Sequence, residues 1–189
     1  MKAAIALLAD YKIQNFVRKI VFNLNRKYNI DFLVSLVPAH ISLKQPFSFE
    51  NMENLENYFA LLARSIKPFE IELDKIYYTE WQGYSILGLN VKETNILRNL
   101  HNRTNKELSE LFENVSAPHD GDTYHFHLTI ELRKIEGENV YKDYFDNLEN
   151  KKVNLGYSAK DIALFYYSDE SFRIGSFMTY EVLPLGIEL

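Results

Sequence analysis

The sequence predicts an α+β protein with two lobes, arranged as a pseudo-duplication in which antiparallel sheets line a central cleft and helices lie outside. Apolar periodicities typical of strands and of helices alternate along the chain. The order strand, helix, strand, helix, strand occurs over residues 2–79 and again over 83–167, with one further strand behind it. No Pro/Gly/Ser-rich linker separates the two stretches, so we expect residues 1–189 to form a single two-lobed domain. From element order alone, a non-repetitive α+β domain fits equally well.

The elements of the first stretch follow from the spacing of its apolar residues. Residues 2–9 are a short apolar run with charged residues directly behind it, which favours a buried strand over a signal peptide. Helical spacing predicts helices over 11–28 and 50–66. Strict alternation predicts a half-buried strand over 69–78, and the apolar stretch 32–43 supplies the strand between the two helices.

The second stretch repeats this alternation. A Gln82-Gly83 turn leads into it, and a polar loop over 117–123 divides it. The expected elements are, in order, a strand over 84–91, a helix over 94–112, a strand over 124–132, a short helix over 138–148 and a closing hairpin formed by 159–167 and 173–183.

Composition and charge exclude several classes of function. The 189 residues contain no Cys, which excludes disulfide frameworks, Cys-ligated metal centres and thiol nucleophiles, and which fits a reducing cytoplasm. A net charge of −5 at pH 7 argues against tight binding to long duplex nucleic acid, although a local site can still hold a small anion. The longest early apolar run is too short to span a bilayer. We therefore expect a cytoplasmic monomer without membrane contacts.

Two of the five histidines begin the same four-residue pattern, at matching places in the two stretches. Side chains alternate between the two faces of a strand, so His40 shares a face with Ser42, and His127 shares one with Thr129. If the two strands face one cleft, two imidazoles and two hydroxyls converge there. The pattern is histidine, apolar residue, hydroxyl residue, apolar residue: His40-Ile41-Ser42-Leu43 and His127-Leu128-Thr129-Ile130.

This set of side chains suits the cleavage or closure of a phosphodiester. A base must take a proton from the attacking oxygen, and an acid must protonate the leaving oxygen on the far side of phosphorus. Histidine serves in both roles near pH 7, so His40 and His127 are the predicted catalytic pair. Ser42 and Thr129 can donate hydrogen bonds to the non-bridging oxygens. The scheme requires no metal and no cofactor.

The paired His-x-Ser/Thr motifs resemble those of the two-histidine (2H) phosphoesterase superfamily, which includes 2′-5′ RNA ligase-like proteins and cyclic nucleotide phosphodiesterases. Residues 37–44 look like the first motif of that family and residues 124–130 like the second, and the motif separation and total length also fit. The resemblance implies a two-lobed fold with a central cleft and metal-independent chemistry on 2′,3′-cyclic or 2′-5′-linked phosphates.

The same resemblance maps His40 and His127 onto the catalytic histidines, and Ser42 and Thr129 onto the phosphate-binding hydroxyls. Basic residues are few near the motifs, which departs from family members that act on structured RNA. We therefore expect a small nucleotide or an RNA terminus as the substrate. Whether the biological direction is hydrolysis or ligation stays open, although the chain has no phosphate-cradling Gly-rich loop for ATP-driven ligation.

Three further residues are candidates for substrate contacts. Lys44 continues the first motif on the face of His40, and a solvated lysine at a strand end is the equal alternative. His125 precedes His127 by two residues and is expected at the rim of the cleft. Tyr166 could stack on a base, although an aromatic residue in such a strand more often packs in the core.

Two other functions compete with this interpretation. His119, His125 and His127 could form the metal site of a metal-dependent hydrolase, but no standard metalloenzyme spacing accompanies them. A non-catalytic nucleotide or RNA-end binding protein would be expected to lose one of the four motif side chains, whereas all four are present. Binding without turnover would identify the second alternative.

Overall fold

A computed structural model describes residues 1–29, 37–81, 83–117, 120–135, 140–147, 152–168 and 177–187. The first part of the predicted 32–43 strand, the turn residue Gln82 and the link between the last two strands lie outside these ranges. The described elements are, in chain order, β1 (Lys2–Leu8), α1 (Tyr11–Tyr28), β2 (His40–Ser48), α2 (Met52–Ser65), β3 (Phe69–Trp81), β4 (Tyr84–Val91), α3 (Asn95–Leu111), β5 (His127–Lys134), α4 (Val140–Asp146), β6 (Lys152–Ala159), β7 (Asp161–Tyr167) and β8 (Phe177–Pro184).

Side-chain caps explain where the three long helices begin. The Asp10 carboxylate accepts hydrogen bonds from the backbone N–H groups of Lys12 and Ile13 at the start of α1. Asn51 and Thr94 cap α2 and α3 in the same way. Each of these helices buries one apolar stripe and exposes its polar face, as the helical spacing predicts.

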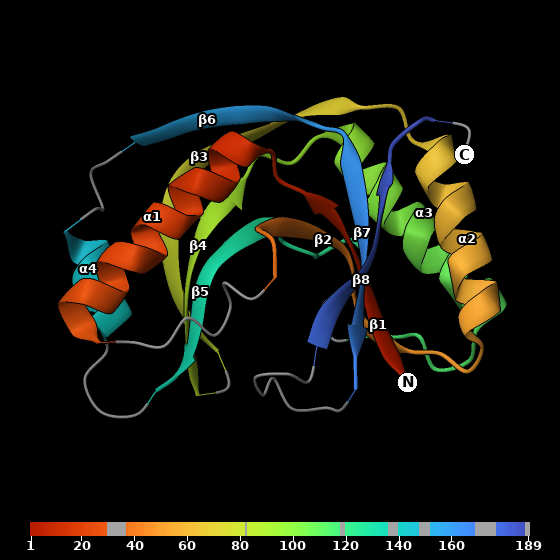
Figure 1. Ribbon diagram of the computed structural model, residues 1–189, viewed down its shortest axis with the longest axis horizontal. Helices are drawn as coiled ribbons and strands as arrows, with labels where there is room; N and C mark the ends of the chain where they lie inside the picture. Colours follow the sequence, from red (N-terminus) through yellow and green to blue (C-terminus); the bar gives the residue numbers. More distant parts are fainter. Residues whose placement is uncertain are drawn as a thin grey trace.

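The strands form one antiparallel sheet in the order β6-β3-β4-β5-β2-β1-β7-β8. The central pair, β2 and β5, is joined only through Ile41 and Leu128, so the sheet divides into two four-stranded halves that meet at the motif strands. Helices α1 and α4 accompany the β3–β5 half, whereas α2 and α3 accompany the other (Figure 1). The expected α+β class with antiparallel strands is confirmed.

The two sequence stretches exchange their last strands. β3, which ends the first stretch, lies beside β4 of the second, and β7, which ends the second stretch, lies beside β1. The helices cross over as well, because α1 contacts β5 and α3 contacts β2. Each half of the sheet is therefore assembled from both halves of the sequence. Local patterns predicted most of the elements and the closing hairpin of β7 and β8, but not the pairing between strands that are distant in the sequence.

Three strands differ most from the ranges that the sequence predicts. β2 begins at His40 and continues to Ser48, whereas the apolar stretch indicated 32–43. β6 was not expected, because Asn154 and Gly156 weaken its strand pattern, yet Val153, Leu155 and Tyr157 alternate between them. β5 begins at His127 and not at residue 124, so the alternation of faces does not extend back to the three residues that precede it.

One large apolar cluster lies between the sheet and its helices and includes Ile41, Leu43, Leu128 and Ile130 from the two motif strands. A second, small cluster of Ala4, Ala6, Ala163 and Phe165 covers the other face of β1 and β7. The motif strands are therefore anchored through their apolar positions, and their polar positions lie on the opposite face. Among the described helices, none has the length and apolarity that crossing a membrane requires.

Candidate active site

Side-chain burial follows the same pattern at the start of β2 and at the start of β5. In each strand the histidine and the hydroxyl residue two positions later are half-buried, and the apolar residues between and after them are buried. The Ile41–Leu128 pair aligns the strands antiparallel. If this register extends by one residue on either side, His40 lies opposite Thr129, and Ser42 lies opposite His127. The structure thus places the four predicted side chains at the junction of the two sheet halves.

Both histidines use the same ring nitrogen to fix their orientation. His40 Nδ1 lies 2.8 Å from the Pro38 carbonyl oxygen, and His127 Nδ1 lies 2.9 Å from the His125 carbonyl oxygen. A carbonyl oxygen only accepts, so Nδ1 carries the proton and donates it in each bond. Nε2 is therefore the nitrogen of each ring that is available for proton transfer.

His40 lies in an apolar environment. Its ring centroid is 4.7 Å from that of Phe165, which belongs to the small apolar cluster on β1 and β7. Burial lowers the pKa of His40 from its ordinary value of 6.5 to about 4, and the charge on His127 adds to this lowering. The hydrogen bond to Pro38 offsets part of the shift. The neutral imidazole is therefore the favoured form at neutral pH.

His127 has a different set of neighbours. Its ring is 6.2 Å from His125 in a nearly parallel arrangement and 6.1 Å from Tyr77 edge-on. Burial lowers its pKa as well, and the charge on His125 contributes to this lowering. The ring of Tyr77 lies over Gly88, where an added Cβ would come within 2.5 Å of a ring carbon. Gly88, which is paired with Thr129 in the sheet, thereby makes room for an aromatic ring next to His127.

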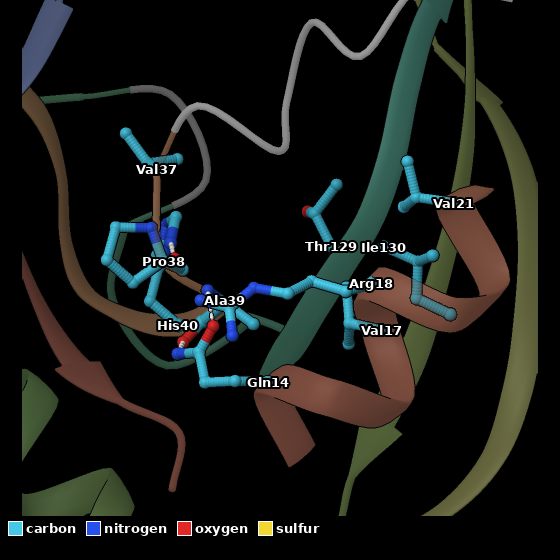
Figure 2. A pocket seen from close by; sticks show the side chains of 10 residues that line it. All are labelled: Gln14, Val17, Arg18, Val21, Val37, Pro38, Ala39, His40, Thr129 and Ile130. Carbon is cyan, nitrogen blue, oxygen red and sulfur yellow. Dashed lines mark hydrogen bonds between the residues drawn. The ribbon is translucent and has the colours of Figure 1, made fainter. Parts of the chain in front are cut away.

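A cavity of about 180 Å³ opens where β2 and β5 diverge, and His40 and Thr129 both line it. Helix α1 forms another part of its wall through Gln14 and Arg18 (Figure 2). The Gln14 carboxamide donates to the Ala39 carbonyl oxygen at 2.9 Å and accepts from the Ala39 N–H at 2.9 Å. This two-bond contact ties α1 to the residue that directly precedes His40.

The additional candidates lie in three different settings. Lys44 is 1% exposed, and its ammonium donates to Asn105 Oδ1 at 2.8 Å and to the Asp120 carboxylate, so it already has two acceptors inside the protein. His125 is exposed, and its ring lies beside that of His127, although it precedes β5 and so lies outside the strand alternation. Tyr166 packs against the main core. Because side chains alternate along β7, its neighbours Phe165 and Tyr167 lie on the other face, with the small apolar cluster near His40.

Sequence reasoning missed a buried polar network that joins the two motif segments. His101, within the predicted helix over 94–112, is fully buried. Its Nδ1 donates to the Leu43 carbonyl oxygen at 2.9 Å, and its Nε2 accepts from the Gly121 N–H at 3.0 Å. Tyr124 stacks on His101 and accepts from Gln45 through its hydroxyl. A lone histidine on the apolar face of a helix was the only signal for this network in the sequence.

Tyr124 also connects the two motifs directly. The predicted strand over 124–132 would put Tyr124 on the face opposite His127, but Tyr124 lies before the start of β5, and its ring centroid is 6.3 Å from that of His127. Burial raises the pKa of Tyr124 to about 12, and the nearby Gln45 and Ser42 side chains offset part of this rise. Tyr124 therefore lies close both to the second histidine and to the first hydroxyl residue.

The alternative metal site falls partly outside the described ranges. His119, one of its three histidines, belongs to a segment that the structure does not describe. Among the residues that are described, no group of three or more His, Cys, Asp or Glu side chains lies close enough to hold a metal ion. His127 uses its Nδ1 for the backbone bond, which leaves one nitrogen for either a proton or a metal.

This chain is therefore an α+β protein with an open antiparallel sheet, and two matched strands at the centre of that sheet each carry a histidine and a hydroxyl residue. Residues 9–170 match the family model of the 2′-5′ RNA ligase superfamily, so the chain belongs to that superfamily. This result confirms the resemblance to 2H phosphoesterases that the two motifs indicated.

Relatives of similar length share modest identity with the chain. A protein of Halalkalibacterium halodurans named "Putative phosphoesterase BH1439" is 27% identical over 191 residues and covers 95% of this chain and 99% of its own. A second, from Geobacillus sp. (strain WCH70), is named "Putative phosphoesterase GWCH70_0799", is 24% identical and covers 98% of this chain and 97% of its own. The similarity therefore extends well beyond the two motifs.

Two solved structures have the same fold. The crystal structure of TT0787 from Thermus thermophilus matches with a TM-score of 0.63 and 16% identity, covering 100% of each chain. That of E. coli LigT complexed with 3′-AMP matches with a TM-score of 0.61 and 16% identity, covering 97% of each chain. At this level of identity the match supports the fold and leaves the chemistry to be argued from the site itself.

Proposed function

We propose that this protein is a metal-independent phosphoesterase that acts on 2′,3′-cyclic or 2′-5′-linked phosphodiesters of small nucleotides or RNA ends. The observation that carries the proposal is the matched pair of histidines at the centre of the sheet, each held through Nδ1 by the carbonyl two residues earlier. Membership of the 2′-5′ RNA ligase superfamily supports this reaction class. The nucleotide bound to LigT supports a small nucleotide ligand.

In the proposed reaction, one imidazole takes a proton from water through Nε2 while the water oxygen attacks phosphorus. The other imidazole, protonated on Nε2, gives its proton to the leaving ribose oxygen as the phosphorus–oxygen bond breaks. Ser42 and Thr129 donate hydrogen bonds to the non-bridging oxygens, where negative charge increases. The backbone bonds of His40 and His127 keep both rings in the required tautomer throughout.

The reaction class is tested by phosphorus NMR on 2′,3′-cyclic nucleotides and 2′-5′-linked dinucleotides, with a chelator present. We expect the wild type to consume at least one class of phosphodiester, and the isomer of the product will identify the bond that breaks. Chelation is expected to leave the rate unchanged. Activity that appears only with added zinc or manganese would instead support the alternative site that includes His119 and His125.

A non-catalytic binding protein is separated from the enzyme by the same samples. Shifts of the nucleotide phosphorus signal without any product, at protein concentrations near those of the nucleotide, would indicate binding without turnover. That outcome would contradict the proposed reaction and retain the site as a nucleotide-binding cleft.

The pH dependence follows from the lowered pKa values of both histidines. The reaction requires one neutral and one protonated imidazole, so the free enzyme is active when the pair carries a single proton. Both pKa values lie below 6.5, with that of His40 at about 4, so this form is populated on the acid side of neutrality.

We therefore expect kcat/KM to be maximal below pH 6.5. It should fall as the pH rises, because the pair loses its remaining proton, and fall again below about pH 4, because His40 gains one. Initial rates at low substrate concentration between pH 3.5 and pH 9, in buffers of constant ionic strength, measure this profile. A kcat/KM that still increases between pH 7 and pH 8 would contradict it.

A further inference from the structure

Among the described residues that line the cavity between β2 and β5, Arg18 is the one permanent cation. Figure 2 shows its side chain extended from α1 toward Ala39 and His40, with Thr129 on the β5 side of the same cavity. Arg18 is exposed, and its hydrogen bond to Asn15 Oδ1 is long, at 3.5 Å. No carboxylate of the described chain lies within 4 Å of its guanidinium. Its donors are therefore available to a ligand.

The remainder of the site supplies little positive charge for an anionic substrate. Lys44, the cation on the first motif strand, donates to Asn105 and to the Asp120 carboxylate. His40 is mainly neutral at pH 7, since its pKa is about 4. Yet transfer at phosphorus places additional negative charge on the non-bridging oxygens, and charged donors directed at such oxygens stabilise that state.

A guanidinium in this position matches a phosphate group in both shape and charge. Its planar fork can donate two parallel hydrogen bonds to two phosphate oxygens, and it stays protonated across the working pH range. The cavity volume of about 180 Å³ is below the roughly 300–1,000 Å³ of sites that enclose a whole small molecule. The cavity can therefore hold one group the size of a phosphate, while the rest of a nucleotide would lie outside it.

We propose that Arg18 binds the anionic oxygens of the reacting phosphate in the cavity that it shares with His40 and Thr129. The proposal rests on the proposed function and adds to it a charged substrate contact on α1, outside both motifs. The contact between Gln14 and Ala39 fixes α1 against the first motif strand, so Arg18 is held at a defined position relative to His40.

The test uses inorganic phosphate as the probe, so that binding is measured separately from turnover. NMR titrations at fixed ionic strength would follow the amide signals of His40 and Thr129 in the wild type, Arg18→Gln, Arg18→Lys and Lys19→Gln. Lys19 is the matched control, because it is an exposed cation on the same helix, next to Arg18, and does not line the cavity. Thermal melts of each variant check that the fold is intact.

We expect Arg18→Gln to weaken phosphate binding roughly tenfold to a hundredfold, as for the loss of a hydrogen bond between charged groups. Lys19→Gln should weaken it by less than about twofold, because solvent and salt screen a charge that does not touch the ligand. Arg18→Lys should fall between the two, since it retains the charge and loses the fork. For turnover of a 2′,3′-cyclic nucleotide we expect the same order.

Two results would overturn the assignment of Arg18. The first is the absence of any phosphate binding that depends on Arg18, and the second is an equal loss in Arg18→Gln and Lys19→Gln. The proposed function fails separately, if wild-type protein turns over no phosphodiester of either class. Binding of phosphate through Arg18 without turnover would therefore retain this site and reject the reaction.

Discussion

Replacing either motif histidine with alanine is expected to lower kcat for a cyclic phosphodiester by about a hundredfold or more, as for the loss of a general acid or base. In the proposed mechanism His40 and His127 act through Nε2 on opposite sides of phosphorus, so neither ring could take over the role of the other. The double variant is expected to be no slower than the slower single variant, since the two residues act as a unit. Single-turnover kinetics with saturating protein measure the chemical step directly.

His125→Ala is the matched comparison for these two variants. His125 is exposed, precedes His127 by two residues and lies 6.2 Å from it, so its removal also changes the local charge and aromatic packing. It should alter kcat by less than about tenfold, because its ring takes no part in proton transfer in this mechanism. Turnover in His40→Ala or His127→Ala as high as in His125→Ala would reject the paired-histidine mechanism.

Asp120→Asn is expected to destabilise the fold by about 3 kcal/mol, the lower end of the cost of breaking a buried ion pair. The Lys44 side chain is 1% exposed, and in the variant its ammonium keeps only neutral acceptors, the Asn105 amide oxygen and the carboxamide oxygen introduced at position 120. A buried cation without its counterion carries a desolvation cost that nothing offsets. In a chain of this length, the expected change corresponds to a decrease in Tm of roughly 6–12 °C.

The reverse substitution is expected to be milder. Lys44→Met leaves the Asp120 carboxylate, whose side chain is 12% exposed and can regain part of its hydration. Combining the two substitutions should restore much of the loss in Asp120→Asn, because no buried charge is then left alone. Urea unfolding of the four proteins forms a double-mutant cycle that measures the coupling between Lys44 and Asp120.

Glu72→Gln provides the matched control on the surface. Glu72 pairs with Lys92, and both side chains are more than half exposed, so solvent already screens their attraction. Its unfolding free energy should stay close to that of the wild type. If Asp120→Asn were as stable as Glu72→Gln, the Lys44 ammonium would not depend on the Asp120 carboxylate. The Lys44–Asp120 pair would then contribute little to holding β2 against the segment between α3 and β5.

Local sequence pattern was sufficient for most of the elements, with β6 missed, and for the motif faces. The alternation of apolar and polar residues correctly predicted that Ile41 and Leu128 face the core, and that His40 and His127 lie on the opposite face. This success has a simple physical reason, because the two-residue period of a strand is a property of the backbone itself. Where the backbone is not a strand, as at Tyr124, the alternation does not apply: the side chain is buried in the main core, as expected for a packing residue, and its ring also lies 6.3 Å from that of His127.

Which segments of the chain contact the motif strands depended on the tertiary structure. Lys44 forms an ion pair with Asp120, and Gln14 forms hydrogen bonds with the Ala39 backbone. Each contact joins segments that are far apart in the sequence, and a local pattern of apolar and polar residues does not predict such contacts. Likewise, the exchange of β3 and β7 between the halves of the sheet depends on which strands pair, and the register of a pair is set by packing across the whole sheet.

By itself, therefore, the sequence indicated the two histidines and two hydroxyl residues of the candidate site and the family that the chain resembles. Only the tertiary structure decided that Lys44 is used internally and that α1 places Arg18 beside His40. The reason is that backbone periodicity is local, whereas burial and ion pairing depend on every segment that meets at a point in space.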